Sequence, residues 1–180
     1  MMQNRHAIWV AQTGIFLALL IVGQIATRPF GTLVTGSVNN ALFILALLLC
    51  GLTTAITLGI ISPILAAALG VGPLWPFVPV IIAANLVRII LWYVIALRRP
   101  EPHKGYDILA LIVSGACKFL VLYFGIVRLV VPLILGLPEP AATAVSAAFS
   151  YPQLITATIG GAIALLLYAP LSKALPRQHP

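Results

Sequence analysis

Two basic side chains lie deep inside apolar stretches and are the residues best placed to act on a ligand. Arg88 is about halfway along the apolar segment 80–97, and Lys118 lies well inside the segment that begins near residue 106. A charge at such depth usually faces a cavity or a partner. We expect one or both cations to attract a ligand carboxylate or phosphate. The alternative is that they bond to carbonyl groups or to Asn85, or reach toward an interface.

Several other polar and aromatic residues are candidates for the same ligand site. Asn85 shares a helix face with Arg88 because the two are three residues apart, although an asparagine there is also a common interhelical contact. The polar stretch 35–40 either caps the next helix or forms a lid over a ligand. Aromatic residues near a triple-proline loop could stack on a flat ligand. The candidates are Thr35, Ser37, Asn39, Asn40, Trp75, Phe77, Asn85, Arg88, Lys118, Tyr123, Tyr151 and Gln153.

The chemistry that the sequence lacks excludes several functions. No Gly-Lys pair of a P-loop, no HExxH or CxxC motif and no G-x-S-x-G motif occurs, so we expect neither an enzyme nor a metal site nor a cofactor. The three acidic residues are Glu101 and Glu139, in predicted loops, and Asp107, at a predicted helix start. An ion-coupled carrier usually needs a carboxylate near the membrane midplane, so that class is disfavoured.

The composition requires a membrane protein. Of the 180 residues, 62% are hydrophobic and only 7% are charged, whereas a soluble domain has roughly 25% charged residues. The sequence predicts an all-α integral membrane protein, a single domain over 1–180 with six transmembrane helices. We expect these helices at about 6–27, 38–54, 55–70, 80–97, 106–131 and 152–171, with a short re-entrant or interfacial helix possible within 132–151.

The basic residues predict the orientation of these helices. In a six-helix arrangement, six cations fall on the side of both termini, namely Arg5, Arg98, Arg99, Lys104, Lys173 and Arg177. Only Arg28 and Arg128 fall on the opposite side. Positive residues favour the cytoplasmic side, so both termini are predicted to be cytoplasmic. The net charge of +7 is then mainly a topology signal, and nucleic-acid binding is not expected.

Small residues form a stripe along the first predicted helix. Ala7, Ala11, Gly14 and Ala18 are spaced by four, three and four residues and share one face. Small stripes allow another helix to approach closely. The stripe either packs against this protein's own helices or docks onto a separate membrane subunit.

Together these features resemble the substrate-binding S component of an energy-coupling factor (ECF) vitamin transporter. The A-x-x-x-A stripe at Ala7 and Ala11 resembles the family's docking motif, and the segments that carry the remaining likeness span nearly the whole chain. They are 33–40, 62–63, 70–73, Pro79 followed by Asn85, and 151–153 followed by Gly160 and Gly161.

The resemblance implies a multi-pass protein of a prokaryotic plasma membrane that binds a vitamin or precursor from outside. It implies docking onto a transmembrane coupling subunit that works with two ATPase subunits, and reorientation in the lipid bilayer to release the ligand inside. The ligand site would be formed by outer loops and helices 4 to 6. The few polar residues slightly favour a large ligand such as cobalamin, while Arg88 and Lys118 suit an anionic vitamin such as pantothenate, folate or biotin. The rival interpretation is a stand-alone carrier or channel subunit acting as a homo-oligomer.

Overall fold

The computed structural model describes residues 2–98 and 104–174, with side chains from residues 6–98 and 105–174. All described regular structure is helical. The six long helices are α1 (Met2–Thr27), α2 (Thr32–Cys50), α3 (Leu52–Ala68), α4 (Val78–Trp92), α5 (Lys104–Leu122) and α7 (Tyr151–Ala174). Short elements complete them: the 3-10 turns η1 (Arg28–Phe30) and η2 (Trp75–Phe77), the π-helical η3 (Tyr93–Leu97) and η4 (Tyr123–Leu135), and α6 (Glu139–Ala148).

The predicted all-α fold with six long helices is confirmed. Five helical spans are long and apolar enough to cross a membrane, and α3 is a shorter apolar helix of 17 residues. That length lies at the lower limit of the roughly 17–25 residues that a spanning helix needs.

The second helix is predicted to begin at about residue 38, and this prediction is wrong by six residues. Helix α2 already begins at Thr32, directly after Gly31. The φ of 86° at Gly31 is not helical, so the chain changes direction there. Gly36 resembles a turn residue in the sequence but lies inside α2. A Cβ atom there would lie 2.9 Å from Cγ2 of Thr156, so this glycine allows α7 to pack closely. Neither Ser37 nor Asn39 caps the helix, because both lie within it.

The boundary between the second and third helices also differs from the prediction. The break falls at Gly51 rather than at residues 53–54, since Gly51 adopts φ 90°, which side chains disfavour. Helix α4 begins two residues earlier than predicted, with Pro79 in its first turn, where a missing N–H has no consequence.

The fifth long helix does not end at residue 131 as predicted. The chain continues as the π-helical η4 to Leu135, with Pro132 inside it. Proline is tolerated in membrane helices where the local winding adjusts to satisfy the freed carbonyl groups. The short helix considered for the following loop is present as α6. The predicted basic connection 98–105 lies largely outside the described residues.

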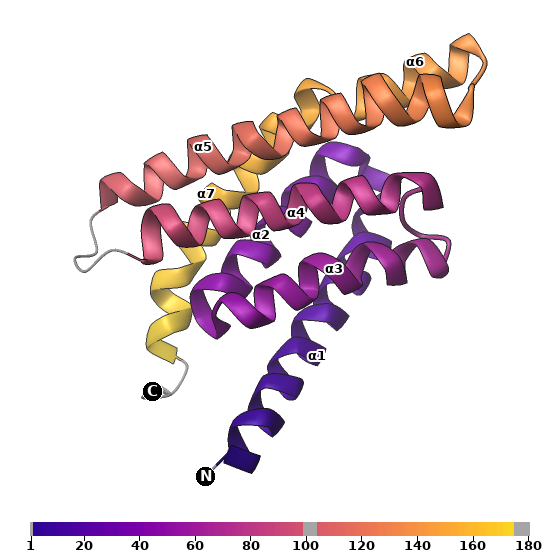
Figure 1. Ribbon diagram of the computed structural model, residues 1–180. Helices are drawn as coiled ribbons and strands as arrows, with labels where there is room; N and C mark the ends of the chain where they lie inside the picture. Colours follow the sequence, from indigo (N-terminus) through magenta and orange to yellow (C-terminus); the bar gives the residue numbers. More distant parts are fainter. Residues whose placement is uncertain (1, 99–103, 175–180) are drawn as a thin grey trace.

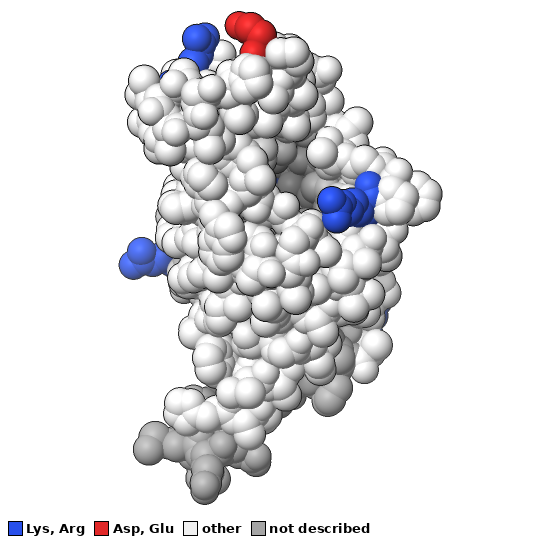
Figure 2. Space-filling view, turned by 90° about the vertical axis from the view of Figure 1, so that its right-hand side faces the viewer, with Lys and Arg blue, Asp and Glu red and all other residues white. Residues whose placement is uncertain are grey.

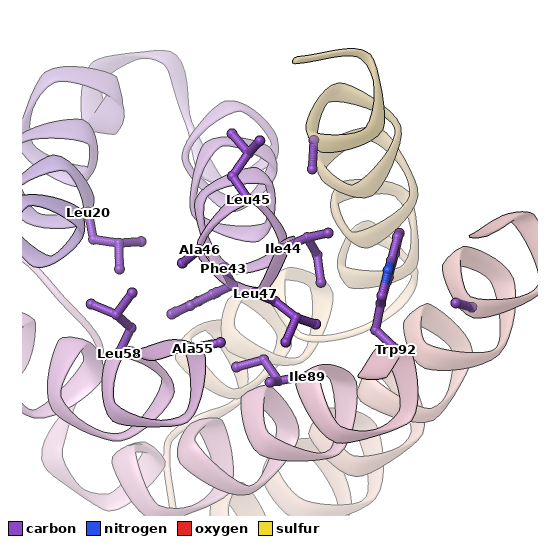
Figure 3. Close-up of a cluster of buried hydrophobic side chains, with 12 residues drawn as sticks. Leu20, Phe43, Ile44, Leu45, Ala46, Leu47, Ala55, Leu58, Ile89 and Trp92 are labelled. Carbon is purple, nitrogen blue, oxygen red and sulfur yellow. The ribbon is translucent and has the colours of Figure 1, made fainter. Parts of the chain in front are cut away.

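A buried apolar cluster holds the helices together on the side of the chain termini. Figure 3 shows Phe43 of α2 on the side of Leu58 of α3, and Leu47 beside Ile89 of α4. Ile44 lies on the side of α2 that faces Trp92 (Figure 3). A second cluster joins α4, α5 and η4 around Phe77, Leu122 and Ile126 and includes the half-buried Phe149 after α6. Polar side chains, among them Asn40, Asn85 and Lys118, belong to neither cluster.

Both chain ends lie at the same end of the molecule, and α6 lies at the other (Figure 1). Helix α1 leaves the bundle toward its N-terminus (Figure 1). Figure 2 looks onto the end that carries α6, which is mostly uncharged, with Lys and Arg side chains near its edges and an acidic side chain at the top of the view.

The packing of α2 along α7 depends on glycine. A Cβ atom at Gly160 would lie 2.5 Å from the carbonyl oxygen of Ser37 and 2.6 Å from Cβ of Asn40. A methyl group therefore does not fit unless the two helices separate. Separation would also move Asn40, whose role is described below.

We predict that Gly160→Ala lowers the stability of the detergent-solubilised protein by roughly 1–3 kcal/mol, the usual cost of overpacking. Gly14→Ala is the matched control, because a Cβ there meets nothing within 4 Å. Thermal unfolding of both variants measures the difference. Equal melting temperatures would contradict the close α2–α7 contact.

Candidate functional site

A cavity of about 300 Å³ lies between the helices at the end remote from the chain termini. All six long helices contribute to its wall, together with the loop between α3 and η2 and the residue after α6. Figure 2 looks onto this end of the molecule and shows a hollow in the surface. The wall residues are Gln24, Thr32, Thr35, Gly36, Asn39, Asn40, Phe43, Ser62, Pro63, Ala66, Val71, Gly72, Pro73, Ile81, Asn85, Lys118, Leu122, Phe149 and Gln153.

Lys118 is the charged group of this wall. Its side chain is only 6% exposed. Nζ donates to Oδ1 of Asn40 at 2.7 Å and to Oδ1 of Asn85 at 3.0 Å, and it lies 6.0 Å from the centre of the Phe43 ring. An ammonium group has three donors, so one remains available for a ligand.

The two asparagines extend this network to the neighbouring helices. Nδ2 of Asn40 donates to Oγ1 of Thr156 on α7 at 3.3 Å, and Nδ2 of Asn85 donates to the carbonyl oxygen of Gly59 on α3 at 3.5 Å. Lys118 therefore connects five helices through two amides. Neither of these two partners is a carboxylate. The positive charge of Lys118 is therefore stabilised by hydrogen bonds to amides but is not neutralised by an opposite charge.

Other polar atoms on the wall have no protein partner. Oδ1 of Asn39 and Oγ of Ser62 are buried and make no hydrogen bond among the described residues. Most buried polar groups in native proteins make a hydrogen bond to the protein or to an ordered water molecule. The cavity thus places the ammonium group of Lys118 among polar side chains between Phe43 and Phe149.

The structure brings six of the twelve candidate ligand residues together on this wall. They are Thr35, Asn39, Asn40, Asn85, Lys118 and Gln153. Whether they bind a ligand stays a prediction. Arg88 does not line the cavity; it is fully buried, and Nη2 donates to the carbonyl oxygen of Ala157 at 2.7 Å.

The remaining five candidates also lie off the wall. Trp75 and Tyr151 are 57% and 69% exposed. Phe77 is buried with its ring centre 5.5 Å from that of Phe149. Tyr123 packs on Phe119 and under Arg128, and Ser37 donates to the carbonyl oxygen of Leu33.

Several wall residues were not among the candidates that the sequence indicated. Gln24 is polar within the apolar first helix, which is a signal that the sequence contains. Ser62-Pro63 was noted only as part of the family likeness. Phe43 and Phe149 carry no sequence signal for a site, because a phenylalanine in an apolar segment is an ordinary packing residue.

The small-residue stripe of α1 faces outward. Ala7, Ala11, Gly14 and Ala18 are all exposed, and nothing lies within 4 Å of a Cβ built on Gly14. The stripe therefore does not pack against the described part of this chain. The interpretation that the stripe packs against the protein's own helices is therefore not supported by the described part of the chain.

We predict that Asn40→Ala lowers stability by roughly 1.5–3 kcal/mol, because it removes a hydrogen bond to a buried charge. Asn39→Ala is the matched control at the next position, since its Oδ1 makes no hydrogen bond. Thermal unfolding of the ligand-free protein measures both. If Asn39→Ala proves the more harmful change, the assigned network is wrong.

The model of one protein family, described as "ECF transporter, substrate-specific component", matches residues 10–172. No curated protein and no solved structure matches the chain. The match covers most of the sequence and agrees with the all-helical fold and its apolar candidate spans. The chain therefore belongs to the substrate-specific components of ECF transporters, which are non-catalytic, multi-pass membrane subunits that bind a substrate and work with an ECF energising module.

Proposed function

We propose that this subunit captures a small anionic vitamin or vitamin precursor in the cavity, with the anionic group on Lys118. The observation that carries the proposal is the ammonium group on the cavity wall, held by two amide oxygens and by no carboxylate. An anion that binds beside such a group is strongly attracted, because the Coulomb interaction between two charges is larger in an interior of low dielectric constant than in water.

The size of the cavity favours a small ligand. Its volume of about 300 Å³ lies at the low end of the roughly 300–1,000 Å³ of small-molecule sites. Cobalamin is far larger, so we favour the anionic alternative, of about the size of pantothenate. Asn39 and Ser62 would select a ligand that carries an N–H or O–H donor beside its anionic group.

We place the cavity on the outer side of a prokaryotic plasma membrane. Lys173 and Arg98 are exposed at the opposite end, as expected for the cytoplasmic side. The subunit then takes its ligand from outside and reorients to release it into the cytoplasm. An exterior almost without charge lowers the cost of that movement in lipid.

We propose that the exposed stripe of α1 docks onto the transmembrane coupling subunit, which two ATPase subunits drive. Its support is the open space at Gly14 and the exposure of Ala7, Ala11 and Ala18. A helix of the coupling subunit can approach such a surface to backbone contact.

We expect Lys118→Met to weaken ligand affinity at least tenfold, as losing one member of a buried charge contact usually costs 2 kcal/mol or more. Arg128→Met is the control, because Arg128 is exposed and lies over Tyr123 outside the cavity. The ligand is first identified by mass spectrometry of small molecules that co-purify, and its affinity is then measured by calorimetry. A ligand without an acidic group, or unchanged affinity, would contradict the proposal.

We expect Ala7→Trp and Ala11→Trp to abolish co-purification with the coupling module while ligand affinity is retained. Ile112→Trp on α5 is the control, since that side chain is also exposed but lies outside the stripe. If the stripe variants retain ATP-dependent uptake, the assignment of the stripe as a docking surface is wrong. The stand-alone carrier interpretation instead predicts uptake into liposomes that contain this chain alone.

A further inference from the structure

Gln24 is the polar side chain that α1 contributes to the cavity wall. It is only 8% exposed, and it makes no hydrogen bond with any described residue. A glutamine inside a membrane bundle usually bonds to a neighbouring helix. Its amide atoms are not among the enclosed polar atoms that lack a partner, so they stay accessible from the cavity.

The packing of α1 directs Gln24 into the bundle. Leu20, one helical turn earlier on the same face, is 0% exposed and belongs to the apolar cluster of α2, α3 and α4. At the neighbouring Gly23, a Cβ would lie 3.3 Å from Cγ1 of Val38 on α2. The exposed small-residue stripe lies on another face of α1, so Gln24 can be substituted without altering the stripe.

Other polar groups of the wall are occupied by protein partners. The amide oxygens of Asn40 and Asn85 accept from Lys118. Nε2 of Gln153 donates to a backbone carbonyl oxygen at 3.0 Å. Gln24, in contrast, keeps both amide N–H donors and the amide oxygen unused. The wall therefore contains a neutral group that can donate and accept, in addition to the ammonium group.

Gln24 and Lys118 reach the cavity from different parts of the bundle. Helix α1 packs against α2 and α3, whereas α5 packs against α4 and α7. Both side chains nevertheless line the same cavity of about 300 Å³. A molecule that fills this space meets the ammonium group with one of its groups and the amide with another.

We propose that Gln24 is a specificity-determining residue that binds a neutral amide, ureido or hydroxyl group of the ligand while Lys118 holds the anionic group. The inference rests on the proposed function and names the substrate class more closely. Amides and hydroxyls both donate and accept, as the glutamine amide does. A simple apolar acid would leave this amide unpaired and without water, and sites built to bond a polar group reject analogues that lack it.

The test uses calorimetry on the full chain in detergent with three probes. Pantothenate and biotin combine a carboxylate with a separate amide or ureido group, and heptanoate has the carboxylate alone. Gln24→Met should weaken the tighter of the two vitamins roughly tenfold, the value of about one hydrogen bond, and leave heptanoate within twofold. Lys118→Met should weaken all three probes.

Gln12→Met is the matched control, because Gln12 is also a glutamine of α1 without a hydrogen bond to the described residues but does not line the cavity. It should leave every affinity unchanged. Both methionine variants should unfold at the temperature of the unmodified protein or above it, since neither loses a hydrogen bond. A fall in melting temperature confined to Gln24→Met would show a structural role and overturn the inference.

The two proposals fail in different ways. Equal weakening of the vitamin and heptanoate by Gln24→Met, or no weakening, overturns the role of Gln24 and leaves the role of Lys118 standing. Unchanged affinities in Lys118→Met overturn the proposed function instead.

A labelling experiment decides the position of Gln24 whichever vitamin the cavity takes. Gln24→Cys and Gln12→Cys are made separately in a chain whose Cys50 and Cys117 are replaced by alanine. An anionic, water-soluble methanethiosulfonate should modify the thiol at position 24 at least tenfold faster than the thiol at position 12. Equal rates, or no reaction at position 24, would overturn the inference.

Discussion

The burial of positive charge in an apolar bundle without acidic partners is the constraint on which the rest of this structure depends. Lys118 satisfies it with two amide oxygens, from Asn40 and Asn85, and each amide uses its own N–H to reach another helix. One ammonium group thereby fixes the relative positions of five helices. Its charge has no acidic partner among the described residues, and this is why we propose that the network that organises the bundle also attracts an anionic ligand.

Small residues make this network possible. Gly160 lets α7 come within contact distance of Asn40, and Gly59 exposes the carbonyl group that Asn85 reaches. Gly161 gives space to Arg88 and Trp92. In a membrane, helices associate by close packing and polar contacts rather than by hydrophobic burial. The glycines and the asparagines are therefore two parts of one packing solution.

The distribution of polar groups separates the two surfaces to which we assign ligand binding and docking. The cavity and its amides lie at one end, and the small-residue stripe runs along α1, away from the cavity wall. A partner on α1 and a ligand in the cavity can be bound together without contact. This arrangement suits a subunit that recognises its substrate by itself and obtains energy from a separate module.

The sequence by itself determined the membrane class, the six long helices, the two deep cations and the stripe, because these depend on composition and on helical period. It misplaced the start of α2 and the α2–α3 break, since a glycine in a turn and a glycine at a helix crossing look alike in a sequence. Only the tertiary structure decided which candidates meet. Asn40 and Lys118 are 78 residues apart, and their contact depends on how the helices cross. The same packing excluded Trp75 and Tyr151 from the wall and buried Arg88 beneath it, because the direction of a side chain follows from the rotation of its helix, which no local pattern specifies.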